Sequence, residues 1–297
     1  MRSTIHLIII LILFSLVACS SQSDGEEPPP SGINEYLNNV GSDTMVNLAL
    51  AWAERYQQEN PQANISVSGG GSGTGIASLI NKTTDIANAS RQIKPEEIEN
   101  SQANGIDPVE FVVAKDAIAV IVNPNNPIDQ LTLQQLSDIY SGKIINWKEI
   151  GGEDRPIVKL SRETNSGTHV YFLEEVLRLG MKDDKTLFST DTLLLPSSEV
   201  IGAEIRTNPN AIGYDGLGYV TPDMKVIAVS AGVGEDLNYI YPSSETVNDG
   251  TYPIARDLYM YTAGTPAGFV QTYMDWIFSK EAQEIVNELG FVPIPLP

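Results

Sequence analysis

The chain has 297 residues, of which 42% are hydrophobic, and it carries a formal net charge of −20 at pH 7. This length and composition indicate a globular protein of one large domain or two medium ones. The strong negative charge argues against nucleic-acid binding, which depends on basic patches that neutralise phosphates, so we expect no nucleic-acid partner.

The first segment has the parts of a secretory signal. Arg2 supplies a positive charge, residues 7–17 are apolar, and the run ends at Leu16-Val17-Ala18-Cys19. This ending resembles a bacterial lipobox, in which the cysteine becomes the lipidated first residue of the mature protein. We therefore predict a lipoprotein signal peptide over residues 1–19. The globular part would then lie outside the cytoplasmic membrane in the cell envelope, with the lipid on Cys19 as its only membrane anchor.

Residues 20–33 are rich in Ser, Glu and Pro, which predicts a flexible tether that buries no core. After this segment, short β-rich runs alternate with helical patterns. We expect strands over residues 36–40, 65–68, 86–90 and 109–113, and helices over residues 44–59, 75–81 and 95–104. This alternation is typical of an α/β fold with a mostly parallel sheet covered by helices on both faces.

A second unit begins near Asp116. Its expected strands span residues 117–122, 157–161, 211–214 and 226–229, and its expected helices span 133–140, 168–179 and 197–207. The C-terminal part then returns to the first pattern. There we expect a strand over residues 258–261 and helices over residues 266–278 and 281–289.

Three turns of similar sequence stand where a strand-like run ends and a helical pattern begins. A helix start offers free backbone N–H groups and the positive end of the helix dipole, while Ser and Thr add hydroxyl donors and Gly lets a ligand approach the backbone. Parallel strands end at one edge of a sheet, so the turns can converge on one crevice. We predict that they hold a small tetrahedral oxyanion without a metal or cofactor. The turns are Gly41-Ser42-Asp43-Thr44, Gly71-Ser72-Gly73-Thr74-Gly75 and Asn165-Ser166-Gly167-Thr168.

Two arginines are expected near these turns. Arg91 follows Ser90 at the end of the third predicted strand, and Arg162 stands four residues before Ser166. A hydrogen bond to a charged group contributes roughly 1.5–3 kcal/mol. Six or more such bonds would exceed the roughly 8 kcal/mol of micromolar affinity, even after the costs of association.

Enzyme interpretations find less support. A serine triad would have to use His169, because the other histidine lies in the signal segment. The Gly-rich run at residues 69–76 lacks the spacing and the lysine of a phosphate-binding P-loop. His and Cys are almost absent from the mature chain, so we predict no metal site. We expect a binding protein and no enzymatic activity. A secreted phosphate-ester hydrolase that uses Ser166 and His169 is the alternative.

From residue 36 to the C-terminus, the chain resembles the PstS-like family, the phosphate-binding lipoproteins of ABC-type phosphate importers. The resemblance implies a two-lobed periplasmic-binding-protein architecture with two chain crossovers and the ligand in the cleft between the lobes. With crossovers near residues 113–116 and 253–256, lobe I comprises residues 34–114 plus 255–297, and lobe II comprises residues 115–254. The stretches that carry the resemblance are 41–44, 71–76, 85–91, 116–124, 139–151, 161–168 and 212–220.

The resemblance also implies specific phosphate contacts. The residues that match family contacts are Thr44, Ser72, Arg162, Ser166, Gly167 and Thr168. Together with the neighbouring candidates in the turns and at the strand ends, the full predicted phosphate-binding set is Ser42, Asp43, Thr44, Ser72, Gly73, Thr74, Ser90, Arg91, Asp116, Arg162, Ser166, Gly167 and Thr168.

The chain departs from the family at one position. Many members have an aspartate directly after the serine that matches Ser90, and this aspartate accepts the proton of hydrogen phosphate and excludes sulfate. This chain has Arg91 there. Another acceptor is then needed, and Asp43 and Asp116 are the candidates. Asp43 could instead cap a helix, and Asp116 could instead pair with Arg91.

The sequence thus predicts a monomeric extracytoplasmic solute-binding protein that captures inorganic phosphate and delivers it to the permease and ATPase of an ABC importer. Two alternatives stay open within binding proteins. One is a receptor for sulfate, molybdate or another tetrahedral oxyanion. The other is a sensor or adhesin that binds phosphate only to signal.

Overall fold

The computed structural model describes residues 35–295, so the predicted signal peptide, Cys19 and the tether lie outside the described residues. The described strands are β1 (Glu35–Gly41), β2 (Ala63–Ser68), β3 (Ile86–Ala89), β4 (Val109–Val122), β5 (Gln130–Thr132), β6 (Val158–Arg162), β7 (Leu193–Leu195), β8 (Ala211–Gly216), β9 (Lys225–Ser230) and β10 (Ala255–Thr262).

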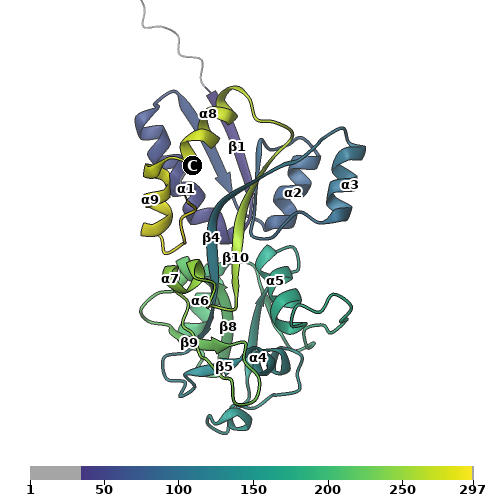
Figure 1. Ribbon diagram of the computed structural model, residues 1–297, viewed down its shortest axis with the longest axis vertical. Helices are drawn as coiled ribbons and strands as arrows, with labels where there is room; N and C mark the ends of the chain where they lie inside the picture. Colours follow the sequence, from purple (N-terminus) through teal and green to yellow (C-terminus); the bar gives the residue numbers. More distant parts are fainter. Residues whose placement is uncertain (1–34, 296–297) are drawn as a thin grey trace, which may run out of the picture. The chain divides into compact units, whose positions relative to one another are not determined.

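Helices flank this sheet (Figure 1). The α-helices are α1 (Val46–Glu59), α2 (Ser72–Ile80), α3 (Pro95–Ala103), α4 (Leu133–Tyr140), α5 (Gly167–Tyr171), α6 (Ser198–Thr207), α7 (Ser244–Asn248), α8 (Gly268–Ile277) and α9 (Lys280–Glu288). Short helical turns are η1 (Asp43–Met45), η2 (Trp147–Ile150), η3 (Phe172–Leu177) and η4 (Leu217–Tyr219). Among residues 35–295, no helix has the length and apolar content needed to cross a bilayer.

The strands pair in the order β2-β1-β3-β10-β4-β8-β6-β7, and β9 pairs with β4 and β5. The pairs β1–β2, β1–β3, β5–β9, β6–β7 and β6–β8 are parallel, as the βα alternation predicts. The antiparallel pairs all involve β4 or β10. The α/β fold class is therefore confirmed, and the antiparallel part comes from the two long strands in its middle.

β4 corrects one sequence-based expectation. Two strands were expected, over residues 109–113 and 117–122, with a second unit beginning near Asp116. The structure has a single strand from Val109 to Val122. The polar residues are tolerated inside it because they are paired: the backbone of Lys115 bonds with that of Val292, and Asp116 accepts hydrogen bonds from the side chain of Arg256 on β10.

The buried apolar side chains change partners along β4. Val113 and Ala114 belong to a core cluster that α1, α8 and α9 cover, whereas Ala117 and Ile118 belong to a second cluster that includes residues of α4 and η3. β4 and β10 run side by side between the two regions (Figure 1). The arrangement agrees with crossovers at these strands, and the lobe boundaries at residues 114 and 254 stay a prediction.

The helix expected over residues 168–179 is shorter and less regular. α5 ends at Tyr171 and continues as the π-helical turn η3. Leu179 and Gly180 then adopt positive φ values of 52° and 71°, which end the helix. β5, β7 and α7 were not expected, because they are only three to five residues long and too short for a periodic pattern.

Candidate functional site

The first turn follows β1. The backbone N–H of Ser42 donates to the carbonyl of Asn88 on β3 (2.9 Å), and the hydroxyl of Ser42 donates to that of Ser90 (2.9 Å). A side chain at Gly41 would clash with Asn88, so glycine lets β1 and β3 approach this closely. Thr44 lies in the helical turn η1 and is buried. The first turn thus places two hydroxyls beside the end of β3.

The second turn opens α2. The helix begins at Ser72, three residues earlier than expected, so Ser72 and Gly73 lie in its first turn. The Ser72 hydroxyl accepts a hydrogen bond from the backbone N–H of Ser90 (3.0 Å) and lies 3.3 Å from the Ser90 hydroxyl. Thr74 is also a predicted phosphate contact. Its hydroxyl instead donates to the carbonyl of Gly70 and so bonds within its own segment.

The third turn reaches across to the first two. Ser166 is the N-cap of α5, and its hydroxyl accepts from the backbone N–H of Thr168 (3.2 Å). The Thr168 hydroxyl lies 2.8 Å from that of Thr44. Asn165 accepts a hydrogen bond from the backbone N–H of Gly73 at its carbonyl (3.0 Å). A Cβ at Gly167 would collide with the hydroxyl oxygens of Ser72 and Ser90. The three turns therefore converge as the sequence predicts.

These buried hydroxyls form one group, which we call the hydroxyl cluster. It comprises Ser42, Thr44, Ser72, Ser90 and Thr168.

Arg256 on β10 is a central cation that the sequence interpretation missed. Its Nη2 donates to the hydroxyls of Thr168 (2.9 Å) and Thr44 (3.4 Å), and its Nη1 donates to the carbonyl of Ser90 (2.9 Å). Asp116 accepts from Arg256 through Nε (3.2 Å) and Nη2 (2.9 Å). The sequence contained a signal for this pair, because residue 256 lies at one expected crossover and residue 116 lies at the other.

Asp116 is fully buried beneath the cluster. Burial raises the pKa of its carboxyl, against the opposing effects of the Arg256 guanidinium and the backbone N–H of Leu217 (3.2 Å). The alternative that Asp116 pairs with Arg91 is wrong, because its partner is Arg256. Among the residues that the structure describes, no group of His, Cys, Asp and Glu side chains is arranged to hold a metal ion.

Arg162 approaches the turns from β6 and is buried. Its Nη2 donates to the carboxylate of Asp43 (2.7 Å), and its Nη1 donates to the hydroxyl of Ser198 (3.0 Å). The other oxygen of Asp43 accepts from the backbone N–H of Gly70 (2.9 Å). Asp43 therefore ties the second turn to Arg162 rather than serving only as a helix cap.

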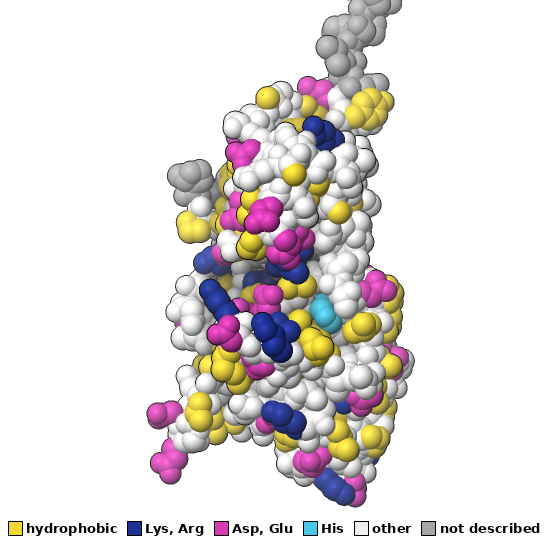
Figure 2. Space-filling model, turned by 90° about the vertical axis from the view of Figure 1, so that its right-hand side faces the viewer, with side chains coloured by type: hydrophobic (Ala, Val, Ile, Leu, Met, Phe, Trp, Pro, Cys, Tyr) yellow, Lys and Arg dark blue, Asp and Glu magenta, His cyan; other side chains and the backbone are white. Residues whose placement is uncertain are grey.

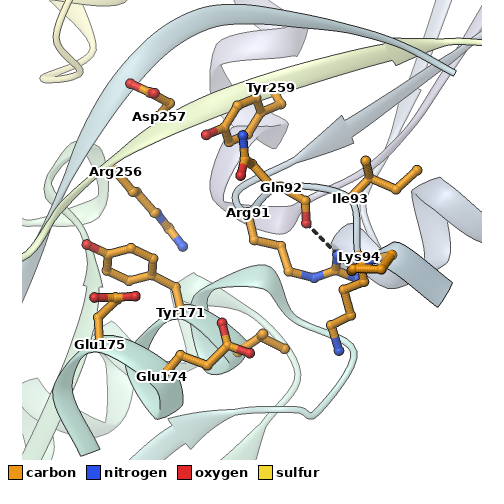
Figure 3. A pocket seen from close by; sticks show the side chains of 12 residues that line it. Arg91, Gln92, Ile93, Lys94, Tyr171, Glu174, Glu175, Arg256, Asp257 and Tyr259 are labelled. Carbon is orange, nitrogen blue, oxygen red and sulfur yellow. Dashed lines mark hydrogen bonds between the residues drawn. The ribbon is translucent and has the colours of Figure 1, made fainter. Parts of the chain in front are cut away.

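Arg91 is not part of the hydroxyl cluster. Its guanidinium makes two hydrogen bonds with the carboxylate of Glu97 (2.8 and 2.7 Å) and donates to the carbonyl of Gln92 (2.8 Å). Figure 3 shows this guanidinium turned away from Arg256. Although burial raises the pKa of Glu97, hydrogen bonds from Arg91 and from the backbone of Lys94 hold it below its usual value. The pair fixes the start of α3.

A pocket of about 470 Å³ leads from the surface to Arg256 (Figure 3). It lies between the segment that leads into α3 and the helix α5. The Tyr171 ring lies beneath the guanidinium of Arg256, with its centroid 5.5 Å from Cζ. Figure 2 shows the face that carries this opening, where acidic and basic side chains gather around a hollow. The pocket is lined by Arg91, Gln92, Ile93, Lys94, Pro95, Val170, Tyr171, Glu174, Glu175, Arg256, Asp257 and Tyr259.

The hydrolase interpretation depends on a base beside Ser166. The Nδ1 of His169 lies 3.0 Å from the hydroxyl of Ser161, which in turn lies 2.5 Å from that of Tyr214. Within residues 35–295, Ser166 has no hydrogen bond to His169. Burial also lowers the pKa of His169. The arrangement offers hydroxyl donors, helix N-termini and cations, and it lacks an activated nucleophile at Ser166.

Comparisons with known proteins agree with this fold. The family model described as "PBP superfamily domain" matches residues 27–281. The phosphate-binding protein PstS of Pseudomonas aeruginosa is 31% identical over 95% of this chain and 90% of its own length. PstS of Bacillus subtilis is 30% identical over 99% of this chain and 95% of its own length.

Solved structures give the same result. A putative phosphate ABC transporter substrate-binding protein from Clostridium perfringens, with bound phosphate, is 31% identical with a TM-score of 0.77. The match covers 88% of this chain and all of that one. An ABC-type phosphate transport receptor from Vibrio cholerae is 28% identical with a TM-score of 0.68, covering 87% of this chain and all of that one. The chain belongs to the PBP superfamily and, within it, to the family of the phosphate-binding proteins PstS.

Proposed function

We propose that this protein captures inorganic phosphate and delivers it to the permease and ATPase of an ABC importer. The observation that carries the proposal is the convergence of three helix-start turns on one buried hydroxyl cluster, with Arg256 inside it and Arg162 beside it. Hydroxyls, free N–H groups and guanidinium groups are donors, and a phosphate offers only oxygen acceptors except for its own proton. The names of the relatives and of the solved structures support the same ligand.

The proposed mechanism is the closure of two lobes around the anion. Residues from the first two turns meet residues of the third through the Thr44–Thr168 contact and through the bond from Gly73 to Asn165. We propose that these belong to two lobes, residues 34–114 plus 255–297 and residues 115–254, which separate to admit the anion. A ligand that touches both sides favours the closed arrangement, because it gains its full set of contacts only there.

Selection of hydrogen phosphate over sulfate rests on a buried acceptor. We assign this role to Asp116, because it lies against Arg256 and its raised pKa makes it a better acceptor of a proton. Sulfate has no proton to donate, so a carboxylate facing it would lose a hydrogen bond and meet a like charge.

The function is tested by isothermal titration calorimetry with the purified mature protein. Phosphate should bind with micromolar or tighter affinity, and sulfate and molybdate should bind about 100-fold more weakly. Tight binding of sulfate or molybdate with no heat from phosphate would overturn the choice of ligand.

We further propose that the protein performs no chemistry on its ligand. The separation of Ser166 from His169 supports this, because a serine nucleophile needs a base within hydrogen-bond reach. Steady release of product from a chromogenic phosphate ester, abolished in Ser166→Ala, would contradict the proposal and favour the hydrolase.

The cell-envelope location is also part of the proposal. We infer a monomeric globular domain outside the cytoplasmic membrane, held by a lipid on Cys19, from the sequence of the signal segment. In the native host, the wild-type protein should partition into the detergent phase, and the Cys19→Ser variant should move to the aqueous phase or keep its signal. Equal partitioning of both, with the signal removed from both, would refute the anchor.

A further inference from the structure

A buried carboxylate lies behind Arg162 on the side away from Asp43. Asp215 is the fifth residue of β8 and is 1% exposed. Ser198, the first residue of α6, accepts a hydrogen bond from Nη1 of Arg162 (3.0 Å) and donates one to Oδ1 of Asp215 (2.9 Å). The Ser198 hydroxyl is therefore a bridge between a proposed ligand-binding cation and a buried acid.

Asp215 is only partly satisfied. Its Oδ1 also accepts from the backbone N–H of Gly216 (2.8 Å). Its Oδ2 is buried and has no hydrogen-bond partner among the residues that the structure describes. An ionised carboxylate normally needs partners on both oxygens, so this environment disfavours the charged form unless a nearby cation compensates.

That cation is Arg162, and the other charged groups near Asp215 do not take over its role. Burial raises the pKa of Asp215 to about 6, while Arg162 and the two hydrogen bonds oppose the rise and Asp116 on β4 adds to it. Asp215 also acts on the phenols of Tyr214 on β8 and Tyr219 on η4. The next charged groups act on these tyrosines, namely Arg256 on Tyr214, and Asp43 and Glu199 on Tyr219. Arg162 is the cation that opposes the rise and that reaches Asp215 through Ser198, although it is also paired with Asp43, whereas Arg256 is bonded to Asp116.

We propose that Asp215 couples proton uptake to anion binding, by taking a proton when the anion engages Arg162. This regulation rests on the proposed function, since it requires Arg162 to hold the ligand. The bound anion adds negative charge on the far side of the guanidinium and so weakens the compensation that Asp215 receives. The Asp215 carboxylate then binds a proton more tightly in the complex than in the free protein.

The sign of the effect follows from linkage. A group whose pKa rises on binding favours binding below its free-state pKa, and this advantage is lost as the pH rises through the pKa of the complex. Each pKa unit by which the anion raises the pKa of Asp215 weakens binding at high pH by about tenfold relative to low pH. Affinity should therefore increase as the medium acidifies from mildly alkaline conditions to about pH 6.

The experiment compares wild-type protein with Asp215→Asn, because phosphate itself titrates in this range and its contribution is common to both. Calorimetry with inorganic phosphate in two buffers of different ionisation enthalpy, between about pH 5 and pH 8, gives the affinity and the number of protons taken up. The wild type should take up an additional fraction of a proton near pH 6 to 7. The variant should bind more tightly than wild type near pH 8 and equally near pH 5.

Two more variants separate coupling from structure. Asp183→Asn removes an exposed carboxylate and should reproduce the wild-type proton uptake. Ser198→Ala keeps Asp215 but removes a donor to its charged form, so the additional uptake should move to higher pH. This second variant tests the coupling even if Asp215→Asn does not fold.

The outcomes are distinguishable. Equal proton uptake in the wild type and in Asp215→Asn would overturn the coupling and leave phosphate binding intact, as would an unmoved profile in Ser198→Ala. Absence of phosphate binding in the wild type would instead overturn the proposed function.

Discussion

Asp116 and Arg256 are direct partners in the antiparallel register of β4 and β10, and Oδ2 of the aspartate accepts hydrogen bonds from both Nε and Nη2 of the arginine. Both side chains are almost completely buried. The same Nη2 contacts the hydroxyls of Thr44 and Thr168. One ion pair on the two central strands thus orients a cation toward turns that lie far apart in the sequence.

This relationship yields a test of the proposed preference for phosphate over sulfate. Asp116→Asn should reduce the preference for phosphate, because an amide can donate to sulfate and no longer repels it. Loss of one hydrogen bond to a charged group corresponds to a roughly 10- to 100-fold change in the ratio of the two dissociation constants. The ratio is measured by calorimetry or by competition with labelled phosphate.

Asp43→Asn is the matched comparison for this selectivity test. Its carboxylate is engaged by Arg162 and by the backbone of Gly70. The variant should therefore bind both phosphate and sulfate more weakly and keep the ratio of their dissociation constants. If Asp43→Asn loses the preference while Asp116→Asn retains it, the acceptor is Asp43 and our assignment is wrong.

Arg162→Ala should weaken phosphate binding by about 10- to 100-fold, because the anion loses a charged donor and Asp43 loses its partner. The half-exposed Arg55, paired with Glu281 on the surface, supplies the control, and Arg55→Ala should leave the affinity unchanged. Arg91→Ala should also change the affinity by less than about threefold, since its guanidinium is held by Glu97. A larger effect at Arg91 than at Arg162 would contradict the placement of both arginines.

Gly167→Ala should impair binding through sterics alone. The added methyl group would meet the hydroxyls of Ser72 and Ser90 and hold the third turn away from the second. We expect a loss of phosphate affinity of at least about tenfold, with a thermal midpoint close to that of the wild type. Calorimetry and thermal unfolding without ligand give the two values, and an unchanged affinity would show that the turns need not come this close.

Trp147 provides a stability test away from the site. It is 2% exposed within the core that also contains Tyr140 and Ile157, and its indole N–H donates to the carbonyl of Asn210 (3.0 Å). Trp147→Ala should lower the free energy of unfolding by about 3–5 kcal/mol. Urea denaturation measures this loss, while the phosphate affinity of the folded variant should stay unchanged. A large loss of affinity without a loss of stability would mean that this segment contributes to binding.

The three turns could be found from the sequence because their chemistry is local. A strand end, a glycine and one or two hydroxyl residues before a helical pattern lie within about five residues, and such a segment forms a helix start in almost any surroundings. Parallel β1 and β2 then place the first two turns at one sheet edge, as the βα alternation predicts.

The cations could be assigned only in part. Arg162 was predicted because it follows the strand before the third turn, four residues before Ser166, and matches a family contact. Arg91 was also predicted beside the turns, but its side chain takes the opposite direction, since Glu97 at the start of α3 offers it a bidentate partner. Sequence distance alone cannot decide which of two directions a long side chain takes.

By itself, the sequence determined the α/β fold class, the family and the positions of the three helix-start turns, because strand periodicity, helix starts and glycine positions act over a few residues. Only the tertiary structure decided which charges meet those turns. Arg256 lies 140 residues from Asp116, and Asp215 reaches Arg162 through Ser198, so these contacts depend on strand register and helix packing. Local patterns do not encode such long-range geometry, which is fixed when the sheet assembles.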